Sequence, residues 1–123
     1  MTKYNLKFGD ILIVTLPQQA GHEQSGERPV LCIFNPLDLG VPRFEIILIA
    51  PLTTTLENWV IKSPKLYPII PGQVGSVSKT SVILLDQIRA MDIKRIIKHS
   101  GSLNQIQMEY LRERIKAIIP AKK

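Results

Sequence analysis

Four short apolar runs, bounded by polar or turn-forming residues, limit what this chain can fold into. They cover residues 11–16, 29–34, 44–51 and 81–85 of the 123-residue chain. Runs of this length are typical of β-strands. Residues 46–49 are apolar without interruption, which predicts a strand buried on both faces. A sequence of short strands separated by Gly/Pro-containing loops favours an antiparallel, barrel-like sheet.

The end of the chain carries the clearest helical pattern. Ser102 followed by Gln105 has the spacing of a capping box, with Ser102 as the N-cap, and Pro120 ends the pattern. One apolar stripe runs between them, and we expect it to pack in the core: Leu103, Ile106, Tyr110, Leu111, Ile115 and Ile118. The sequence therefore predicts a mainly β fold, a small barrel closed by a terminal helix, in one domain over residues 1–123.

Three segments before this helix have weaker patterns. Trp59–Ile61 is compatible with a short strand, and residues 63–80 predict an irregular or hairpin segment because they contain three prolines and two glycines. Asp92 is expected to cap a short helical turn through residues 94–97. The expected connections are a polar loop at 17–28 and a loop that follows Asn35.

Composition excludes several classes of protein. The single cysteine, Cys32, rules out an internal disulfide framework and lies in an apolar run, which is typical of an unreactive core thiol. No apolar run approaches the ~18 residues of a membrane span, and the first run is too short and polar-flanked for a signal peptide. We therefore expect a cytoplasmic protein without a membrane partner.

Charge is distributed unevenly along the chain. The net charge is +6, of which residues 1–60 contribute −2 (four Lys/Arg, six Asp/Glu) and residues 61–123 contribute +8 (twelve Lys/Arg, four Asp/Glu). A basic face favours polyanions such as nucleic acid. A basic protein with no such partner is the alternative, and net charge alone does not separate the two.

One loop concentrates the chemistry of the chain. Residues 21–30, Gly-His-Glu-Gln-Ser-Gly-Glu-Arg-Pro-Val, bring an imidazole, two carboxylates, an amide and a guanidinium between two predicted strands. An arginine for the anion and a histidine or glutamate for protons would suit a reaction at a phosphodiester. The alternative is a polar hairpin tip that only contacts water.

The same sequence offers little to a metal ion or a nucleotide cofactor. Cys32, His22 and His99 lack zinc-ligand spacing, the acidic residues are scattered, and no phosphate-binding Gly-rich loop is present. We expect no cofactor. A nuclease of this composition would be metal-independent, and metal-independent cleavage of RNA uses the 2′-hydroxyl as nucleophile, which DNA lacks.

The loop and its surroundings resemble the MazF/PemK family of ribonuclease toxins. The resemblance rests on Gly9-Asp10 before the first strand, on residues 21–30 before the second, and on Ala50–Thr53 at the end of the third. Residues 81–92, Ser-Val-Ile-Leu-Leu-Asp-Gln-Ile-Arg-Ala-Met-Asp, also agree in order. The resemblance spans roughly residues 8–119.

This resemblance implies an SH3-like barrel that forms a homodimer and cleaves single-stranded RNA at specific sequences without a metal ion. The expected products have 2′,3′-cyclic phosphate and 5′-hydroxyl ends. An antitoxin whose C-terminal tail occupies the RNA groove would neutralise the enzyme. Two alternatives remain at this point: a toxin of the same fold that binds DNA gyrase without catalysis, and an inactive relative that binds RNA or antitoxin.

The resemblance also assigns catalytic roles. Arg28 takes the position of the family's essential arginine, and Thr53 that of its catalytic threonine. His22, Glu23 and Asp86 are candidate proton-transfer residues, and the general base is not assigned among them.

Candidate RNA-binding residues flank these positions: Gln24, Thr54, Gln87 and Arg89. The chain departs from part of the family at Leu84, where some plasmid-borne members have an arginine. That departure leaves Arg28 as the main cation for the phosphate.

Overall fold

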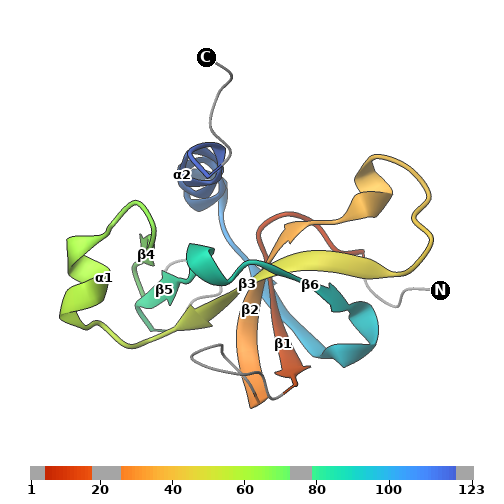
Figure 1. The fold of residues 1–123 in the computed structure, drawn as a ribbon, viewed down its shortest axis with the longest axis horizontal. Coiled ribbons are helices and arrows are strands. Elements are labelled where there is room, and N and C mark those ends of the chain that lie inside the picture. Colours follow the sequence, from red (N-terminus) through yellow and green to blue (C-terminus); the bar gives the residue numbers. More distant parts are fainter. Residues whose placement is uncertain (1–4, 18–25, 73–78, 119–123) are drawn as a thin grey trace.

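In the part of the chain that the computed structural model describes (residues 5–17, 26–72 and 79–118), seven strands form one antiparallel sheet (Figure 1). The strands are β1 (Asp10–Leu16), β2 (Gly26–Phe34), β3 (Ile46–Thr53), β4 (Ile69–Ile70), β5 (Ser81–Ile83), β6 (Arg89–Asp92) and β7 (Ile96–Ser102). The α-helices are α1 (Asn58–Lys62) and α2 (Gln105–Lys116), and the 3₁₀ turns are η1 (Pro36–Asp38), η2 (Leu85–Gln87) and η3 (Ile93–Arg95). The predicted mainly β fold with a terminal helix is confirmed.

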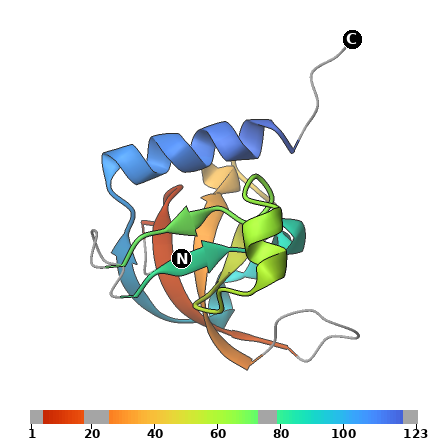
Figure 2. The same ribbon diagram turned by 90° about the vertical axis from the view of Figure 1, so that its left-hand side faces the viewer.

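Strand β3 is the centre of the sheet. The strand order is β4-β5-β3-β2-β1-β7, and β6 also pairs with β3. One edge of β3 pairs with β2, while its other edge pairs with β6 over Ile46–Ile49 and with β5 at Leu52 and Thr53. One strand serving two partners on one edge bends the sheet into the barrel-like shape seen in Figure 2.

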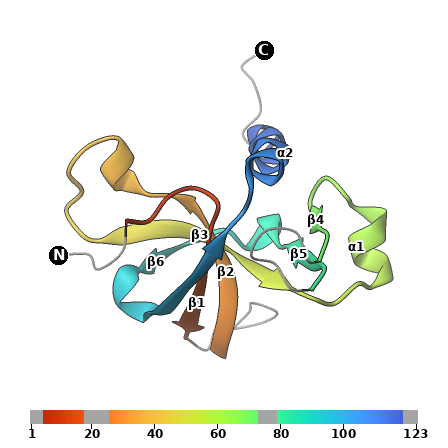
Figure 3. The same cartoon turned by 180° about the vertical axis from the view of Figure 1, so that it is seen from behind.

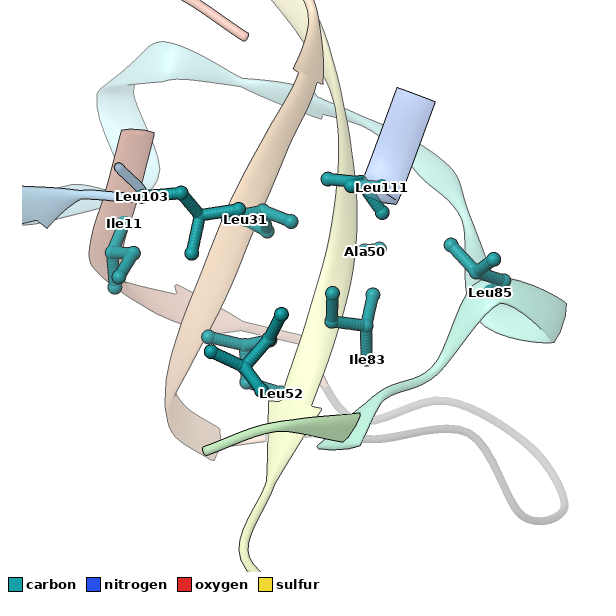
Figure 4. Close-up of a cluster of buried hydrophobic side chains, with 9 residues drawn as sticks. Ile11, Leu31, Ala50, Leu52, Ile83, Leu85, Leu103 and Leu111 are labelled. Atoms are coloured by element: carbon teal, nitrogen blue, oxygen red, sulfur yellow. The ribbon is translucent and has the colours of Figure 1, made fainter. Parts of the chain in front are cut away.

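Two apolar clusters bury the two faces of this sheet. One lies between the sheet and α2 and includes Leu31, Ala50, Leu52 and Leu111 (Figure 4). The other fills the inside of the barrel: Leu6, Leu12, Val14, Leu16, Val30, Cys32, Ile47, Ile49 and Met91. β3 contributes to both clusters, and residues 49–52 are buried, so the prediction of a strand buried on both faces is confirmed for the second half of β3. In its first half, Ile46 and Leu48 are only half-buried.

Helix α2 covers one side of the barrel and directly follows β7 (Figures 2 and 3). Its N-cap is Asn104, whose Oδ1 accepts from the Gln107 N–H at 2.8 Å, while Gln107 Oε1 accepts from the Asn104 N–H at 2.8 Å. The predicted N-cap, Ser102, was therefore wrong by two residues. Its hydroxyl donates to Asp10 Oδ1 at 2.7 Å and so joins β7 to β1. The expected stop at Pro120 lies outside the described residues.

The prediction of a wholly buried stripe on α2 was also wrong. Leu103 and Leu111 are buried, but Ile106 is 80% exposed and Tyr110 is 42% exposed. These two side chains line an apolar depression of about 430 Å³ against β4 instead of entering the core. The face of α2 that packs on the sheet is therefore narrower than the apolar stripe predicted, because it excludes Ile106 and Tyr110.

Other expected boundaries changed because of strand pairing. β2 begins at Gly26 rather than residue 29, since its ladder with β1 continues to Leu16. Gly26 has φ +83°, a conformation that favours glycine, so it suits the entry to β2. The prediction of a strand at 59–61 was wrong: these residues belong to α1, which buries Val60 against Val82 and Leu84 and leaves its two neighbours exposed.

Asp92 caps a helical turn as predicted, since its carboxylate accepts from the Lys94 N–H at 2.9 Å. The turn ends at Arg95, however, and residues 96–97, which were predicted to belong to it, lie in β7. The strands on either side of that turn, β6 and β7, were not predicted.

Cys32 is fully buried, and burial, with a smaller contribution from Asp10, raises the pKa of its thiol to about 12, as expected of a core cysteine. In the described part of the chain, neither helix is long and apolar enough to cross a bilayer.

Candidate functional site

Three strand ends meet at one end of the sheet, and they bring Arg28 and Thr53 together. Val30 of β2 pairs with Pro51 of β3 in antiparallel register. Continued by two residues, this register would place Arg28 opposite Thr53, and both residues line the same depression. Thr53 in turn pairs with Val82 at the start of β5.

These ends surround a depression of about 360 Å³. It is lined by Arg28, Pro29, Leu52, Thr53, Thr54, Thr55 and Ser81. Its polar groups are therefore one guanidinium and four hydroxyls from three neighbouring segments. Sequence analysis identified Arg28, Thr53 and Thr54, and the structure places all three at this depression.

The Arg28 guanidinium has unused hydrogen-bonding capacity. Its Nε is buried and has no hydrogen-bond partner among the described residues. Within that part of the chain, no ion pair joins Arg28 to the neighbouring Glu27. A buried donor without an acceptor costs free energy. The same arginine lines the depression, where its guanidinium can pair with an anionic ligand.

The Thr53 hydroxyl is oriented by Thr55, two residues further along the chain. Its Oγ1 accepts from the Thr55 N–H at 3.3 Å and donates to Thr55 Oγ1, also at 3.3 Å. The backbone contact fixes one lone pair, while the proton is held only by a neutral hydroxyl at a long distance. A phosphate oxygen is a stronger acceptor than Thr55 Oγ1, so the Thr53 hydroxyl would donate its hydrogen bond to the phosphate instead.

Asp86 lies outside the lining of this depression. It belongs to η2, is exposed, and its Oδ2 accepts from the Tyr67 hydroxyl at 2.6 Å. This hydrogen bond raises the pKa of Tyr67, because the phenolic proton is shared with a carboxylate. Asp86 is therefore not among the residues that line the depression with Arg28 and Thr53.

The remaining predicted residues fall into two groups. Gln87 and Arg89 follow Asp86, and neither lines the depression, although each has interactions elsewhere. Arg89 lines a different hollow, of about 260 Å³, with Leu16 and Arg95. His22, Glu23 and Gln24 lie outside the described residues.

Sequence analysis missed two residues at the depression, Thr55 and Ser81. Thr55 was visible only as part of a hydroxyl cluster, residues 53–55. The signal for Ser81 was its position at the start of a predicted strand, but the register that brings it to the end of β3 is not readable from sequence. Among the described residues, no group of three or more His, Cys, Asp or Glu gathers as metal ligands.

Comparisons with known proteins identify the family and the fold of this chain. Residues 7–119 match the model of the PemK-like, MazF-like toxin family of type II toxin-antitoxin systems. The chain is 31% identical over 103 residues to endoribonuclease MazF of Staphylococcus epidermidis, a match that covers 84% of this chain and 82% of that protein.

Two crystal structures from Deinococcus radiodurans share the fold. The chain superposes on MazF (form I) with a TM-score of 0.71 at 20% identity, covering 94% of this chain and 97% of the other. It superposes on the MazE–MazF structure (form II) with a TM-score of 0.66 at 22% identity, covering 94% and 96%. The family model and the Staphylococcus relative each cover most of the chain, which therefore belongs to the PemK-like, MazF-like toxins of type II toxin-antitoxin systems.

Proposed function

We propose that this protein is a toxin endoribonuclease that cleaves single-stranded RNA without a metal ion. The observation that carries the proposal is the buried Arg28 Nε without a described partner, beside the threonine hydroxyls of one depression. The Staphylococcus relative, named an endoribonuclease, supports the same activity.

In the proposed reaction, the scissile phosphate occupies the depression. The 2′-hydroxyl of the preceding nucleotide loses its proton to a general base, and its oxygen attacks phosphorus. The pentavalent intermediate carries additional negative charge, which the Arg28 guanidinium and the Thr53 hydroxyl stabilise by hydrogen bonds. The 5′-oxygen then leaves with a proton from a general acid, which gives a 2′,3′-cyclic phosphate and a 5′-hydroxyl end.

The proton-transfer residues remain candidates. His22 and Glu23 belong to the segment that connects β1 to Gly26, two residues before Arg28. An imidazole is suited to proton transfer near neutral pH. Asp86 is the third candidate, but its carboxylate already accepts a hydrogen bond from Tyr67. We therefore favour the segment before Arg28 as the source of the base. Gln24, Thr54, Gln87 and Arg89 are proposed to contact the RNA.

We also propose an antitoxin partner and a homodimer. Membership of a toxin–antitoxin family and the fold shared with a MazE–MazF structure support the antitoxin. The +8 charge of residues 61–123 would attract an acidic antitoxin tail as well as RNA. Sedimentation of the purified protein, alone and with its antitoxin, would test both associations.

The test is cleavage of a long single-stranded RNA in EDTA, with the ends mapped by primer extension. We expect discrete cuts, 5′-hydroxyl ends on the downstream fragments and cyclic phosphates on the upstream ones. An equal concentration of single-stranded DNA should stay intact, because it lacks the nucleophile. Intact RNA from several varied substrates would contradict the proposal, and inhibition of gyrase supercoiling by the same preparation would favour the gyrase-binding alternative.

A further inference from the structure

The segment that follows the Arg28–Thr53 depression carries a pair of aromatic rings, of which Trp59 is exposed and Tyr67 is half-buried. Trp59 in α1 is 42% exposed, and its ring lies 4.9 Å from that of Tyr67, centroid to centroid, at 82°. This edge-to-face arrangement is a favoured geometry for an aromatic pair. Sequence analysis had expected a short strand here and gave these rings no role.

Both rings are held by hydrogen bonds at their polar ends. Trp59 Nε1 donates to Glu57 Oε2 at 3.2 Å, and the Tyr67 hydroxyl donates to Asp86 Oδ2 at 2.6 Å. With its only donor in use, Trp59 offers a ligand mainly its aromatic surface. The orientation of that surface is set before any ligand arrives, so binding costs little side-chain entropy.

The segment that carries the rings is anchored to the sheet. Val60, next to Trp59, is fully buried against Val82 and Leu84, and Tyr67 packs against the same cluster. An exposed Trp59 beside a buried Val60 is therefore a consequence of how α1 docks and not of a loose surface loop. Tyr67 is tied further by its N–H, which donates to the Ser63 carbonyl at 2.9 Å.

The aromatic pair is close to the proposed phosphate site. Thr55 lines the depression, and Trp59 follows four residues later, so their Cα atoms are at most ~14 Å apart. Two exposed cations, Lys62 and Lys65, lie on the same segment. A surface that places an aromatic ring and cations next to a phosphate-binding depression suits a nucleotide chain that continues past the depression.

We infer that Trp59, braced by Tyr67, is a stacking platform for an unpaired RNA base one to a few nucleotides from the cleaved phosphate. The inference rests on the proposed function and extends it from phosphate binding to recognition of bases. Every base has a π-face, so stacking alone tolerates different sequences. The carboxylates of Glu57 and Asp86 next to the rings accept hydrogen bonds, so they favour bases whose edges carry amino donors.

The single tryptophan of the chain makes this inference directly measurable. All intrinsic tryptophan fluorescence comes from Trp59, and a base stacked on the indole quenches it. The probe is a random-sequence decamer of 2′-fluoro RNA, which has no 2′-hydroxyl and cannot be cleaved. A fully abasic decamer of the same charge is the control, because it offers phosphates without bases.

We expect the 2′-fluoro decamer to quench Trp59 and the abasic decamer to leave its emission almost unchanged. Trp59→Ala should weaken binding of the decamer roughly 5- to 140-fold, whereas Trp59→Phe should retain most of the affinity. Phe44→Ala is the matched control, because Phe44 is also an exposed aromatic (58%) but lies in the loop before β3, at the opposite end of that strand. It should bind like wild type.

Three outcomes would overturn the inference. Equal quenching by both decamers would mean that Trp59 senses the charged backbone and not a base. No quenching, together with Arg28-dependent cleavage of ordinary RNA, would mean that the RNA leaves the depression in another direction. Unchanged RNA affinity of Trp59→Ala with weakened antitoxin binding or self-association would assign the surface to a protein partner.

Cleavage of unmodified RNA by the same preparations reports separately on the proposed function. Quenching without cleavage would retain the stacking platform and contradict the ribonuclease. Thermal unfolding of Trp59→Ala and Trp59→Phe should show that both variants are folded at the assay temperature.

Discussion

Two polar regions lie beside the ends of strands: the depression around Arg28, and the corner formed by Asp86 and Tyr67, which is the hydrogen-bonded pair at η2. In the depression, the Arg28 Nε has no described partner and the Thr53 proton is held at 3.3 Å by a neutral hydroxyl. At the corner, the Asp86 carboxylate accepts a 2.6 Å hydrogen bond from Tyr67. The side chains of the depression can still form hydrogen bonds to a ligand, whereas the Asp86 carboxylate already accepts one from within the protein.

This difference separates two residues that the sequence had placed in one list of catalytic candidates. A guanidinium whose Nε has no described partner is stabilised when an anion binds it, so ligand binding is favoured at the depression. A carboxylate already bonded to a phenol gains less from a ligand and must lose that bond before it takes a different position. We therefore expect substitutions in the depression to reduce cleavage much more than substitutions at the corner.

The largest effect is expected for Arg28. Arg28→Ala should reduce the rate of RNA cleavage roughly 10²- to 10³-fold, the usual cost of losing one donor to a developing oxyanion. Arg28→Lys should recover only a small part, because an ammonium group cannot reproduce the planar fork of the guanidinium. Single-turnover cleavage of one labelled RNA measures both variants.

Arg43→Ala is the matched control for this substitution. Arg43 lies in the loop before β3, at the opposite end of that strand, with its guanidinium 4.8 Å from the Phe44 ring centroid. Its removal changes the net charge by the same amount. A comparable loss in Arg43→Ala would show that overall charge, and not the depression, controls cleavage.

The next effect is expected for Thr53. Thr53→Val keeps the shape and removes the hydroxyl, and the rate should fall roughly 10- to 100-fold, as for the loss of a hydrogen bond to a charged group. Thr53→Ser should keep most of the activity, since it retains the hydroxyl that the Thr55 N–H orients. If valine and serine variants were equally slow, packing rather than the hydroxyl would explain the loss.

A smaller effect is expected for Asp86. Asn can still accept from Tyr67, so Asp86→Asn should leave the corner intact and reduce cleavage less than about tenfold, below the 10²–10⁴ expected for loss of a general base. The pH–rate profile of the variant should keep the shape of the wild-type profile. A loss above 10² with a changed profile would make Asp86 the base and contradict the contrast between the two regions.

The smallest effect concerns stability at high pH. The hydrogen bond to Asp86 raises the pKa of Tyr67 above its usual value of about 10. The folded protein therefore keeps a proton that the unfolded chain loses, and this contribution is complete below about pH 10 and lost as pH rises above it. Tyr67→Phe lacks the contribution, so the difference in free energy of unfolding between wild type and variant should shrink as pH is raised above 10. Urea unfolding at pH 8 to 11 measures it, and a constant difference would contradict the assignment.

Much of the fold was predictable because the long central strands consist of uninterrupted or nearly uninterrupted apolar residues. β1 differs from its predicted range by one residue and β3 by two at each end, and Asp92 caps its turn as expected. β6 and β7 were missed because residues 89–102 are rich in charged and polar side chains. They are strands because the edges of β3 and β1 were available to pair with them.

The site was predictable only where its chemistry lies in one short stretch of sequence. Arg28 and Thr53 follow from the motifs that contain them, and their proximity follows from strand register. The roles of Ser81 and Tyr67 depend on contacts between segments far apart in the chain, which local patterns do not encode. The same limit explains the N-cap, since Ser102 and Asn104 both fit the capping pattern and only the contact between Ser102 and Asp10 separates them.

The most direct test of the account is the NMR signal of the Arg28 Nε–H group during titration with the uncleavable 2′-fluoro decamer. The signal is assigned by its absence from Arg28→Lys. If Arg28 holds the phosphate, its Nε–H resonance will shift and exchange more slowly with water on saturation, while that of Arg43 will not change. Binding of the decamer without any change at Arg28 Nε–H would contradict the claim that this arginine is the phosphate site.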